Sequence, residues 1–304
     1  MFKLLRIGTR ESQLAVWQAT QVQQLLANHG INSELVYIRS EGDIDLKTPL
    51  YEMGVQGIFT RSLDLALLND RIDLAVHSMK DVPTRLPEGI AQAAVLARGP
   101  VNDLLVYREE DDFLSDDEII ANIATSSIRR KAQWLHKYPK HQMHNLRGNV
   151  NTRLKKLNEM GWHGAIFAQA GLERINLRPD KSVILDWMLP APAQGAIMVA
   201  CRSNDDFSLE ACSLLNHEVT ALCTTIERDF LRTLLGGCST PISALAVVQN
   251  GNLHFQGNIL SLDGRKKVVI EKTVPIDQVK TLGSDAAFEL LNLGGKEIAE
   301  EIRK

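Results

Sequence analysis

Short apolar runs alternate with longer amphipathic stretches in the first third of the chain, and this alternation constrains the fold more than any other feature. The apolar run at 3–8 predicts a first strand, and the stretch after it predicts a helix that Ser12 caps. Further strands are expected at 34–38 and 72–78, with a second helix beginning after Thr60. Repeated strand–helix–strand units predict a largely parallel sheet in an α/β fold.

A second unit with similar patterning follows a Gly99-Pro100 break and an acidic stretch at 103–118. A strand at 122–124 leads into a capped helix, and the segment 164–175 again has a strand followed by a helix. The segment 189–196 contains two prolines, which a helix interior excludes, so we expect it to form a return crossing. The sequence contains no internal repeat that relates the two units.

The last section of the chain has a different pattern. A long helix is expected from 218 to 235. Asn250-Gly251 and Asp263-Gly264 then separate β-rich runs, which predicts three antiparallel strands joined by tight turns. A further helix begins near residue 284, and Gly294-Gly295 predicts a break or bend within it.

Basic residues gather in the second unit. The whole chain has a formal charge of −3, yet residues 125–178 contain eleven Lys or Arg and only two Glu, a local charge of +9. Guanidinium groups bind carboxylate or phosphate in a bidentate manner, so several on one rim predict a ligand with several negative groups. Five arginines lie at or near predicted strand-to-helix turns, where helix N-termini also present N–H groups: Arg129, Arg130, Arg147, Arg153 and Arg174.

The ligand of this basic region is either a phosphate or a polycarboxylate, and the residues alone do not decide between them. The sequence has neither a GxxxxGK[ST] loop nor a GxGxxG fingerprint, so no standard phosphate-binding motif supports the first alternative. A nucleic-acid partner is disfavoured because aromatic residues are sparse among the basic ones and the basicity is confined to one unit. The neighbouring lysines are expected to form a solvated face: Lys137, Lys140, Lys155 and Lys156.

Ser78, Lys80 and Asp81 end or follow the apolar strand at 72–78. Ligands of open α/β sheets bind outside the carboxyl ends of the strands, so these residues lie where a site is expected. A carboxylate in a partly dry cleft stabilises a developing cation or transfers a proton. A turn or capping role for Asp81, paired with Lys80, is the alternative, and the residues alone leave both open.

Cys238 follows Gly236-Gly237, where the long helix is expected to end, and lies on a loop. It is either a small buried residue or a nucleophile or attachment point, since loops expose side chains to ligands. His77 and His217 are the candidates for a Cys–His pair, but both lie in predicted elements and are expected to be structural. The four cysteines include no CxxC pair, so we expect free thiols and no metal site.

The chain is also expected to be cytoplasmic. No run approaches the ~18 apolar residues that a membrane crossing needs. Charged residues interrupt the apolar stretch at the N-terminus, which argues against a signal segment. We therefore expect no membrane partner. We also expect a monomer, because no predicted helix has an apolar stripe without a partner.

Eight motifs, in order from residue 8 to residue 243, resemble the porphobilinogen deaminase (hydroxymethylbilane synthase) family. They are GTRESQLA (8–15), GIFTRSLD (57–64), DLAVHSMKDVP (73–83), ATSSIRRKAQ (124–133), LRGNVNTRL (146–154), AGLERI (170–175), LPAPAQGA (189–196) and GGCSTPIS (236–243). The match is specific over this span, whereas the region after residue 243 agrees in pattern more than in letters.

The resemblance implies an α/β fold of three domains. Two are periplasmic-binding-protein-like α/β lobes, and the third is a small α+β C-terminal domain with a three-stranded antiparallel sheet. The first lobe carries the catalytic aspartate, the second the arginine-rich surface for carboxylates, and the third the cofactor-bearing cysteine. The expected boundaries are 1–96 with 196–214 for the first lobe, 100–190 for the second, and 217–304 for the third domain.

The resemblance also implies a transferase of tetrapyrrole biosynthesis, with a dipyrromethane cofactor attached covalently through Cys238. Four molecules of porphobilinogen are joined in turn to this primer with loss of ammonia, and hydrolysis releases hydroxymethylbilane. Asp81 is then the catalytic carboxylate. The implied cofactor-binding residues are Cys238, Ser78, Lys80, Asp81, Thr125, Ser126, Ser127, Arg129, Arg130, Arg147 and Gly148. The implied substrate-binding residues are Arg10, Ser12, Phe59, Arg147, Arg153, Arg174 and Gln194.

The chemistry of this reaction independently requires a binding site lined with basic residues. Each pyrrole carries an acetate and a propionate, so a lengthening chain repels itself unless cations surround it. The rival hypothesis is a non-catalytic two-lobed module that binds a polycarboxylate, because fold alone does not decide function. The presence of both Asp81 and Cys238 disfavours that rival, since a pure binding module needs neither.

Overall fold

The structure, a computed structural model, describes residues 4–39, 60–234 and 240–303. These residues form two compact units, and the last of the three points at which the described chain passes between the units falls within one helix, α7. The first unit, lobe 1, comprises residues 4–39, 60–99 and 195–222. The second unit comprises residues 100–194, 223–234 and 240–303. Phe59 and Cys238 lie outside the described residues.

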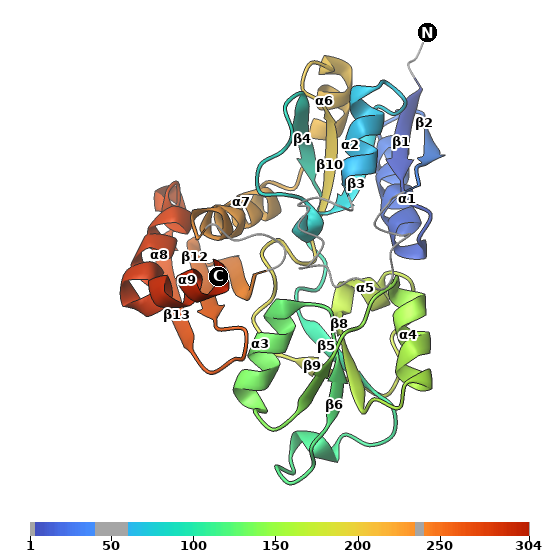
Figure 1. Ribbon diagram of the computed structural model, residues 1–304. Helices are drawn as coiled ribbons and strands as arrows, with labels where there is room; N and C mark the ends of the chain where they lie inside the picture. Colours follow the sequence, from blue (N-terminus) through green and yellow to red (C-terminus); the bar gives the residue numbers. More distant parts are fainter. Residues whose placement is uncertain (1–3, 40–59, 235–239, 304) are drawn as a thin grey trace. The chain divides into compact units, whose positions relative to one another are not determined.

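Lobe 1 is built on a five-stranded sheet in the order β2-β1-β3-β10-β4 (Figure 1). Its neighbours β2, β1 and β3 are parallel, while β10 is antiparallel to both β3 and β4. The sheet is therefore largely parallel, as predicted, with one reversed strand. The elements are β1 (Leu5–Thr9), α1 (Gln13–Asn28), β2 (Ser33–Tyr37), α2 (Arg61–Leu68), β3 (Leu74–Ser78), β4 (Ile90–Val95), β10 (Ile197–Arg202) and α6 (Asp206–Ser213).

Residues 100–194 of the second unit form lobe 2, a five-stranded sheet in the order β7-β6-β8-β5-β9. Here β5 is the single reversed strand, antiparallel to both β8 and β9. The stretch 103–118 was expected only to separate the two units, and this expectation was wrong for its first residues. Asp103 opens an apolar run, and this run forms β5. The elements are β5 (Asp103–Tyr107), β6 (Asn122–Ala124), α3 (Ile128–Lys137), β7 (Gln142–His144), α4 (Val150–Glu159), β8 (Gly164–Ala168), α5 (Gln169–Glu173) and β9 (Ser182–Leu185), with a 3-10 turn at Asp112–Leu114.

The sheet of lobe 2 is buried on both faces. Successive residues of a strand point to opposite faces, so the apolar run of β5 divides between two clusters. Leu104 and Val106 pack in the cluster that α4 covers, and Leu105 packs with Trp134 of α3. Figure 1 shows α3 and α4 on opposite sides of this sheet. Burial on both faces explains why these strands have continuous apolar runs rather than alternating ones.

The C-terminal part of the second unit contains a three-stranded antiparallel sheet, as predicted. Asn250 and Gly251 join its first two strands with φ angles of 51° and 76°. Gly294, with a φ of 109°, breaks the last helix where the sequence predicted a bend. The elements are α7 (Glu218–Thr233), β11 (Ile242–Gln249), β12 (Asn252–Leu260), β13 (Lys267–Pro275), a 3-10 turn at Ile276–Gln278, α8 (Leu282–Leu290), a wider turn at Leu291–Gly295 and α9 (Lys296–Arg303).

These three sheets confirm the predicted fold class. The chain forms two α/β lobes, with lobe 2 inserted between β4 and β10 of lobe 1, and then a small C-terminal α+β part. The predicted return crossing is confirmed as well, because β10 follows the proline-containing segment and pairs with β3 and β4 of the first lobe. No helix among the described residues is both long and apolar enough to cross a membrane.

Candidate functional site

The candidate residues of lobe 1 gather at one edge of its sheet. Because β1 and β3 are parallel neighbours, with Gly8 paired to Ala75, their carboxyl ends lie side by side. This is the edge where ligands of α/β sheets bind. Five predicted site residues end or follow these two strands: Arg10, Ser12, Ser78, Lys80 and Asp81. Ser12 stands at the predicted cap position of α1, although its side chain makes no capping hydrogen bond.

A 3-10 turn, Met79–Asp81, fixes the position of the predicted catalytic carboxylate. Met79 and Val82 are buried on either side of it, and the Met79 N–H donates to the Ala196 carbonyl at 3.0 Å. Lys80 and Asp81 lie between these anchors and are half-buried. The turn therefore holds Asp81 at the sheet edge with only part of its side chain in water.

Two side chains beneath this edge were not assigned to it from the sequence. Gln18 of α1 is buried, and its Nε2 donates to Ser78 Oγ at 2.9 Å. His77, which ends the buried part of β3, has no hydrogen-bond partner for Nε2 among the described residues. Burial and the positive charge of Arg10 lower the pKa of His77 to about 4, so this ring is neutral at pH 7. His77 is thus a core residue, as expected.

The candidate residues of lobe 2 also lie at the carboxyl ends of parallel strands. β6 is paired with β7 and β8 in parallel, so the loops after these three strands share one edge. The loop after β6 begins helix α3, where Ser127 Oγ accepts from the Arg130 N–H at 3.4 Å. Thr125 Oγ1 accepts from the Ser127 N–H at 3.2 Å. The predicted site residues on the loops and helices after these strands are Thr125, Ser126, Ser127, Arg129, Arg130, Arg147, Gly148, Arg153 and Arg174.

Asp103, the first residue of β5, is a buried carboxylate that the sequence analysis missed. Because β5 and β8 are antiparallel, Asp103 pairs with Ala168 and lies at the same edge. Its Oδ2 accepts from Arg129 Nη2 at 2.7 Å, and its Oδ1 accepts from Arg130 Nη2 at 2.8 Å. Gln194 Nε2 donates to Oδ1 at 2.9 Å, which brings this predicted substrate-binding residue into the same cluster.

The Asp103 cluster keeps a net positive charge, because two guanidinium groups face one carboxylate. Arg129 and Arg130 are only 4% and 5% exposed. Burial lowers the pKa of Arg129, and the Asp103 carboxylate opposes that effect. Both arginines also donate to backbone carbonyls, Arg129 Nη1 to Leu189 at 2.8 Å and Arg130 Nη1 to Ile166 at 3.0 Å. Their orientation is thus fixed by the protein itself.

The loop after β7 and the helix that follows it carry the next two cations. Arg147 is 4% exposed and Arg153, on α4, is half-buried. Arg153 Nε donates to the Gly148 carbonyl at 2.7 Å, so part of this guanidinium holds the loop. Asn149 caps α4, with Oδ1 accepting from the Thr152 N–H at 2.9 Å.

Arg174 directly follows α5, the short helix that begins at this edge, and is half-buried. Burial lowers its pKa to about 10, which leaves the side chain protonated at neutral pH. Arg174 therefore adds a partly desolvated positive charge to the edge. A charge of this kind interacts with an anion more strongly than one in bulk water.

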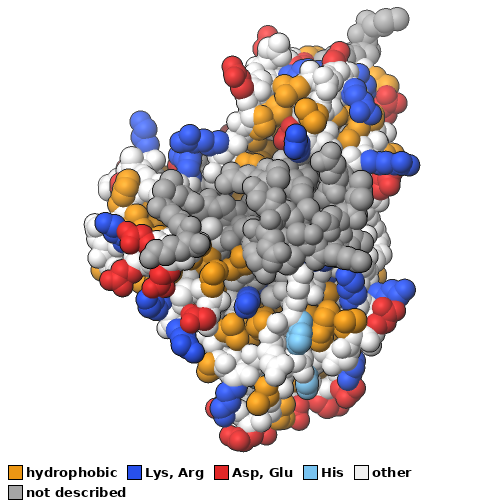
Figure 2. Space-filling view, in the orientation of Figure 1, with side chains coloured by type: hydrophobic (Ala, Val, Ile, Leu, Met, Phe, Trp, Pro, Cys, Tyr) orange, Lys and Arg blue, Asp and Glu red, His pale blue; other side chains and the backbone are white. Residues whose placement is uncertain are grey.

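The neighbouring lysines divide into two groups. Lys137, Lys140 and Lys155 are exposed, as predicted for a solvated face. Figure 2 shows Lys and Arg intermixed with Asp and Glu on the visible face of the molecule. Lys156 differs from the prediction, because it is half-buried and its Nζ donates to the Arg147 carbonyl at 3.0 Å.

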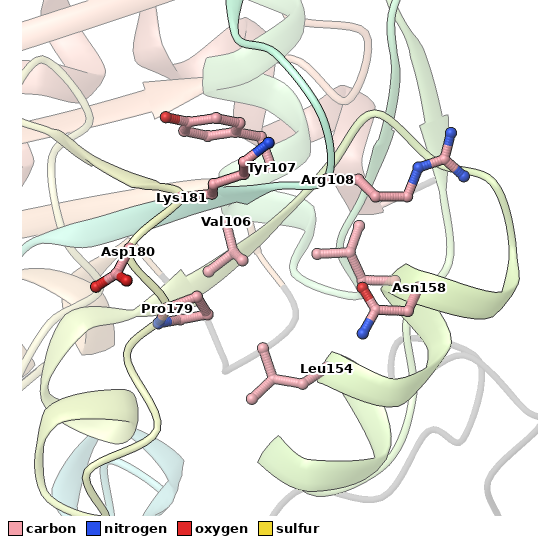
Figure 3. Close-up of a pocket in the computed structure, with 9 residues that line it drawn as sticks. Val106, Tyr107, Arg108, Leu154, Asn158, Pro179, Asp180 and Lys181 are labelled. Atoms are coloured by element: carbon pink, nitrogen blue, oxygen red, sulfur yellow. The ribbon is translucent and has the colours of Figure 1, made fainter.

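A hollow of about 460 Å³ in lobe 2 lies away from the edge that carries the candidate site residues (Figure 3). Val106, Leu154 and Pro179 surround it, with Arg108 and Lys181 among the polar residues that line it. Tyr107, which also lines it, pairs with Gly164 at the start of β8. The hollow therefore lies at the amino ends of the parallel strands, opposite the edge that carries the predicted site.

The described cysteines are buried free thiols: Cys201, Cys212 and Cys223. Burial raises the pKa of the Cys212 thiol to about 12, so this group is a poor nucleophile at neutral pH. No group of three or more His, Cys, Asp or Glu in the described part of the chain is arranged to hold a metal ion.

The fold and these two edges define a class of protein with two α/β lobes. One sheet edge presents a carboxylate, and the other presents a set of fixed guanidinium groups suited to anions. Comparison with known families narrows this class. Residues 5–210 match the family described as "Porphobilinogen deaminase, dipyromethane cofactor binding domain", and residues 221–292 match "Porphobilinogen deaminase, C-terminal domain". The chain belongs to the porphobilinogen deaminase family.

Relatives with this name match along nearly the whole chain. The porphobilinogen deaminase of Chlorobium phaeobacteroides is 40% identical over 100% of this chain and 99% of its own length. The chloroplastic enzyme of Oryza sativa is 43% identical over 94% of this chain and 83% of its own length. Among solved structures, the periplasmic VFT2 domain of Bordetella pertussis BvgS has a TM-score of 0.43 at 11% identity, over 70% of this chain and 86% of that chain.

Proposed function

We propose that this protein is the transferase that joins four porphobilinogen molecules head to tail, with loss of ammonia, and releases hydroxymethylbilane by hydrolysis in tetrapyrrole biosynthesis. The observation that carries this proposal is the family match over residues 5–210, the span that contains Asp81 and all five candidate arginines. The geometry of the two sheet edges agrees with it, because the substrate has both carboxylates to bind and an amine to lose.

The arginines of lobe 2 are proposed to bind the carboxylates of the cofactor and the growing chain. Arg129 and Arg130 supply a fixed net positive charge around Asp103, and Arg147 lies in the loop between β7 and α4. Charged hydrogen bonds to guanidinium contribute roughly 1.5–3 kcal/mol each. A preorganised set of such donors binds anions without the cost of ordering long side chains. Arg10, Ser12, Arg153, Arg174, Gln194 and Phe59 are proposed to contact substrate, with Thr125, Ser126, Ser127 and Gly148 holding cofactor.

Asp81 is proposed as the catalytic residue. As ammonia leaves porphobilinogen, a positive charge spreads over the pyrrole ring, and a nearby carboxylate stabilises it. The same carboxylate can move a proton at the pyrrole nitrogen or the leaving amine. Its half-buried position supports this role, since partial exclusion of water strengthens the interaction of Asp81 with a cation. Lys80 and Ser78 are proposed to hold cofactor beside it.

Cys238 is proposed to anchor a dipyrromethane through a thioether bond. When bound, this group supplies a pyrrole α-carbon that is nucleophilic without a base system. The described residues of lobe 2 fit such a group, because its acetates and propionates match the cationic cluster of Arg129, Arg130 and Asp103. Of the four cysteines, three are buried thiols. They are therefore poor candidates for the attachment.

Intact-protein mass spectrometry tests the attachment. Freshly made, active protein should exceed the mass of the bare chain by two linked pyrrole units. Cys238→Ser protein should have the mass of the bare chain, whereas Cys223→Ala, which removes a buried thiol, should keep the adduct. A bare mass in active wild-type protein contradicts the proposed attachment of the cofactor through Cys238.

Steady-state turnover tests the role of Asp81. Asp81→Asn keeps the size of the side chain and removes its charge, so we expect turnover to fall by about 10²–10⁴-fold while the adduct is retained. Asp180→Asn, at an exposed position, is the control and should leave turnover unchanged. Turnover within about twofold of wild type in Asp81→Asn removes this residue from the mechanism.

We further propose a monomeric, cytoplasmic enzyme of three domains that binds no nucleic acid. The domain boundaries are 1–96 with 196–214, 100–190, and 217–304. The separate sheet of β11, β12 and β13 supports the third domain, since none of its strands pairs with a strand of another described sheet. Sedimentation equilibrium tests the monomer, and limited proteolysis followed by mass analysis tests the boundaries.

A further inference from the structure

Lys156 and Arg153 hold two consecutive peptide groups of the loop after β7. Lys156 Nζ donates to the Arg147 carbonyl at 3.0 Å, and Arg153 Nε donates to the Gly148 carbonyl at 2.7 Å. The two side chains lie three residues apart on α4, so they share one face of the helix. Both carbonyl groups are therefore directed toward the same face of α4.

The direction of these carbonyls fixes the direction of the amides that follow them. In a planar trans peptide, the C=O of one residue and the N–H of the next point in opposite directions. The N–H groups of Gly148 and Asn149 therefore point away from the cationic face of α4. Neither N–H has a hydrogen-bond partner among the residues that the structure describes. Both are free to donate to a carboxylate bound beside Arg147.

Two further features constrain the conformation of this loop. Gly148 has a φ of +117°, which side chains rarely adopt, and a Cβ there would lie 2.7 Å from Thr152 Cγ2. Asn149 Oδ1 accepts hydrogen bonds from both the N–H and the Oγ1 of Thr152, at 2.9 and 3.0 Å. Thr152 and Arg153 thus hold Asn149 and the Gly148 carbonyl, whereas Lys156 holds the Arg147 carbonyl.

We propose that Lys156 is a positioning residue for carboxylate binding. Its ammonium group holds the Arg147 peptide so that the Arg147 side chain and the Gly148 amide stay oriented toward one bound carboxylate of cofactor or substrate. Lys156 itself binds the backbone and does not touch the ligand. This inference rests on the proposed function, since it assigns the ligand of the Arg147 loop.

Adjacent lysines provide a matched pair of variants. Lys156→Met removes the ammonium group and keeps the aliphatic stem, whereas Lys155→Met changes an exposed lysine whose ion pair among the described residues is with Glu159 at 3.6 Å. We expect Lys156→Met to raise KM for porphobilinogen about tenfold, the effect of one charged hydrogen bond of roughly 1.5 kcal/mol, with kcat changed less than about threefold. Intact mass spectrometry should also show a smaller fraction of chains with the two-pyrrole adduct.

Lys156→Arg restores a cation at this position and should recover most of the affinity. The same KM in Lys156→Met and Lys155→Met, with equal adduct fractions, overturns the inference. A lowered unfolding midpoint with unchanged KM also overturns it, because Lys156 is then only structural. If Lys156→Met fails to fold, Lys156→Gln is measured in the same way. A wild-type protein without any adduct contradicts the proposed function instead, so the two failures are distinguishable.

Discussion

Replacing Asp103 with asparagine tests the central electrostatic feature of lobe 2. Asp103 is fully buried and receives three hydrogen bonds from two guanidinium groups, one from Arg129 and two from Arg130. Asparagine keeps the shape of the side chain but removes the negative charge. Its amide NH₂ then also faces a guanidinium donor, which it cannot satisfy.

The magnitude of the effect follows from burial. Arg129 and Arg130 are 4% and 5% exposed, so without Asp103 two like charges remain close together with no counterion among the contacts described for them. Removing one partner of a buried ion pair costs about 3–5 kcal/mol, because the remaining charge is uncompensated. We therefore expect Asp103→Asn to lower the free energy of unfolding by about 3–5 kcal/mol.

Urea unfolding at pH 7 measures this change as a lower midpoint with an unchanged m-value. Asp180→Asn, at an exposed position, should change the free energy of unfolding by at most about 0.5 kcal/mol. Arg130→Gln in the Asp103→Asn background should cost less than Arg130→Gln alone, because it removes an uncompensated charge. A loss below about 1 kcal/mol in Asp103→Asn, or additive effects in the double variant, would refute the reasoning.

Two further predictions concern stability. Gly264→Ala should destabilise the protein by at least about 2 kcal/mol more than Gly251→Ala in urea unfolding, since a Cβ at Gly264 lies 2.5 Å from the Ala132 carbonyl of α3 and one at Gly251 meets nothing within 4 Å. Equal effects would mean that only the positive φ angles matter. Burial raises the pKa of Asp73, but hydrogen bonds from Arg6 and Arg202 outweigh this effect and depress the pKa below its unfolded value. The contribution of Asp73 to the stability of the fold is therefore present above about pH 4 and is lost as the pH falls below it. Stability measured from pH 6 to pH 3 should therefore fall less steeply below pH 4 in Asp73→Asn, and identical slopes would exclude this role.

Both sheet edges could be predicted from the sequence. Each local pattern predicts where a strand ends, and in a parallel sheet neighbouring strands end at the same edge. A helix cap after an apolar strand, as in Ser126-Ser127 after β6, marks a carboxyl end wherever it occurs, and parallel neighbours bring such ends together. The positions of Asp81, Arg130 and Arg147 relative to their strands were predictable for this reason.

Long-range partners were not predictable in the same way. Asp103 contacts side chains 26, 27 and 91 residues further along the chain, and no local pattern specifies those distances. The strand that begins at Asp103 was also missed, because the acidic residues that follow it made the stretch 103–118 resemble a polar linker. Lys156 was assigned to the solvated face because lysines on a helix usually are solvated, and only the path of the preceding loop brings a carbonyl within its reach.

A comparison of the two lobes shows that the topology determines where the site lies, whereas the side chains determine its charge. Both sheets have the same order of directions, with the reversed fourth strand supplied by β10 in one lobe and β5 in the other, although no sequence repeat relates them. The edge at which loops gather is therefore a property of the fold. The sign of the charge there is a property of the residues that follow the strands, Asp81 after β3 in lobe 1 and arginines after β6 and β7 in lobe 2. Under the proposed function, one architecture provides a carboxylate for a developing cation and a set of cations for carboxylates, and neither task requires a change in the sheet.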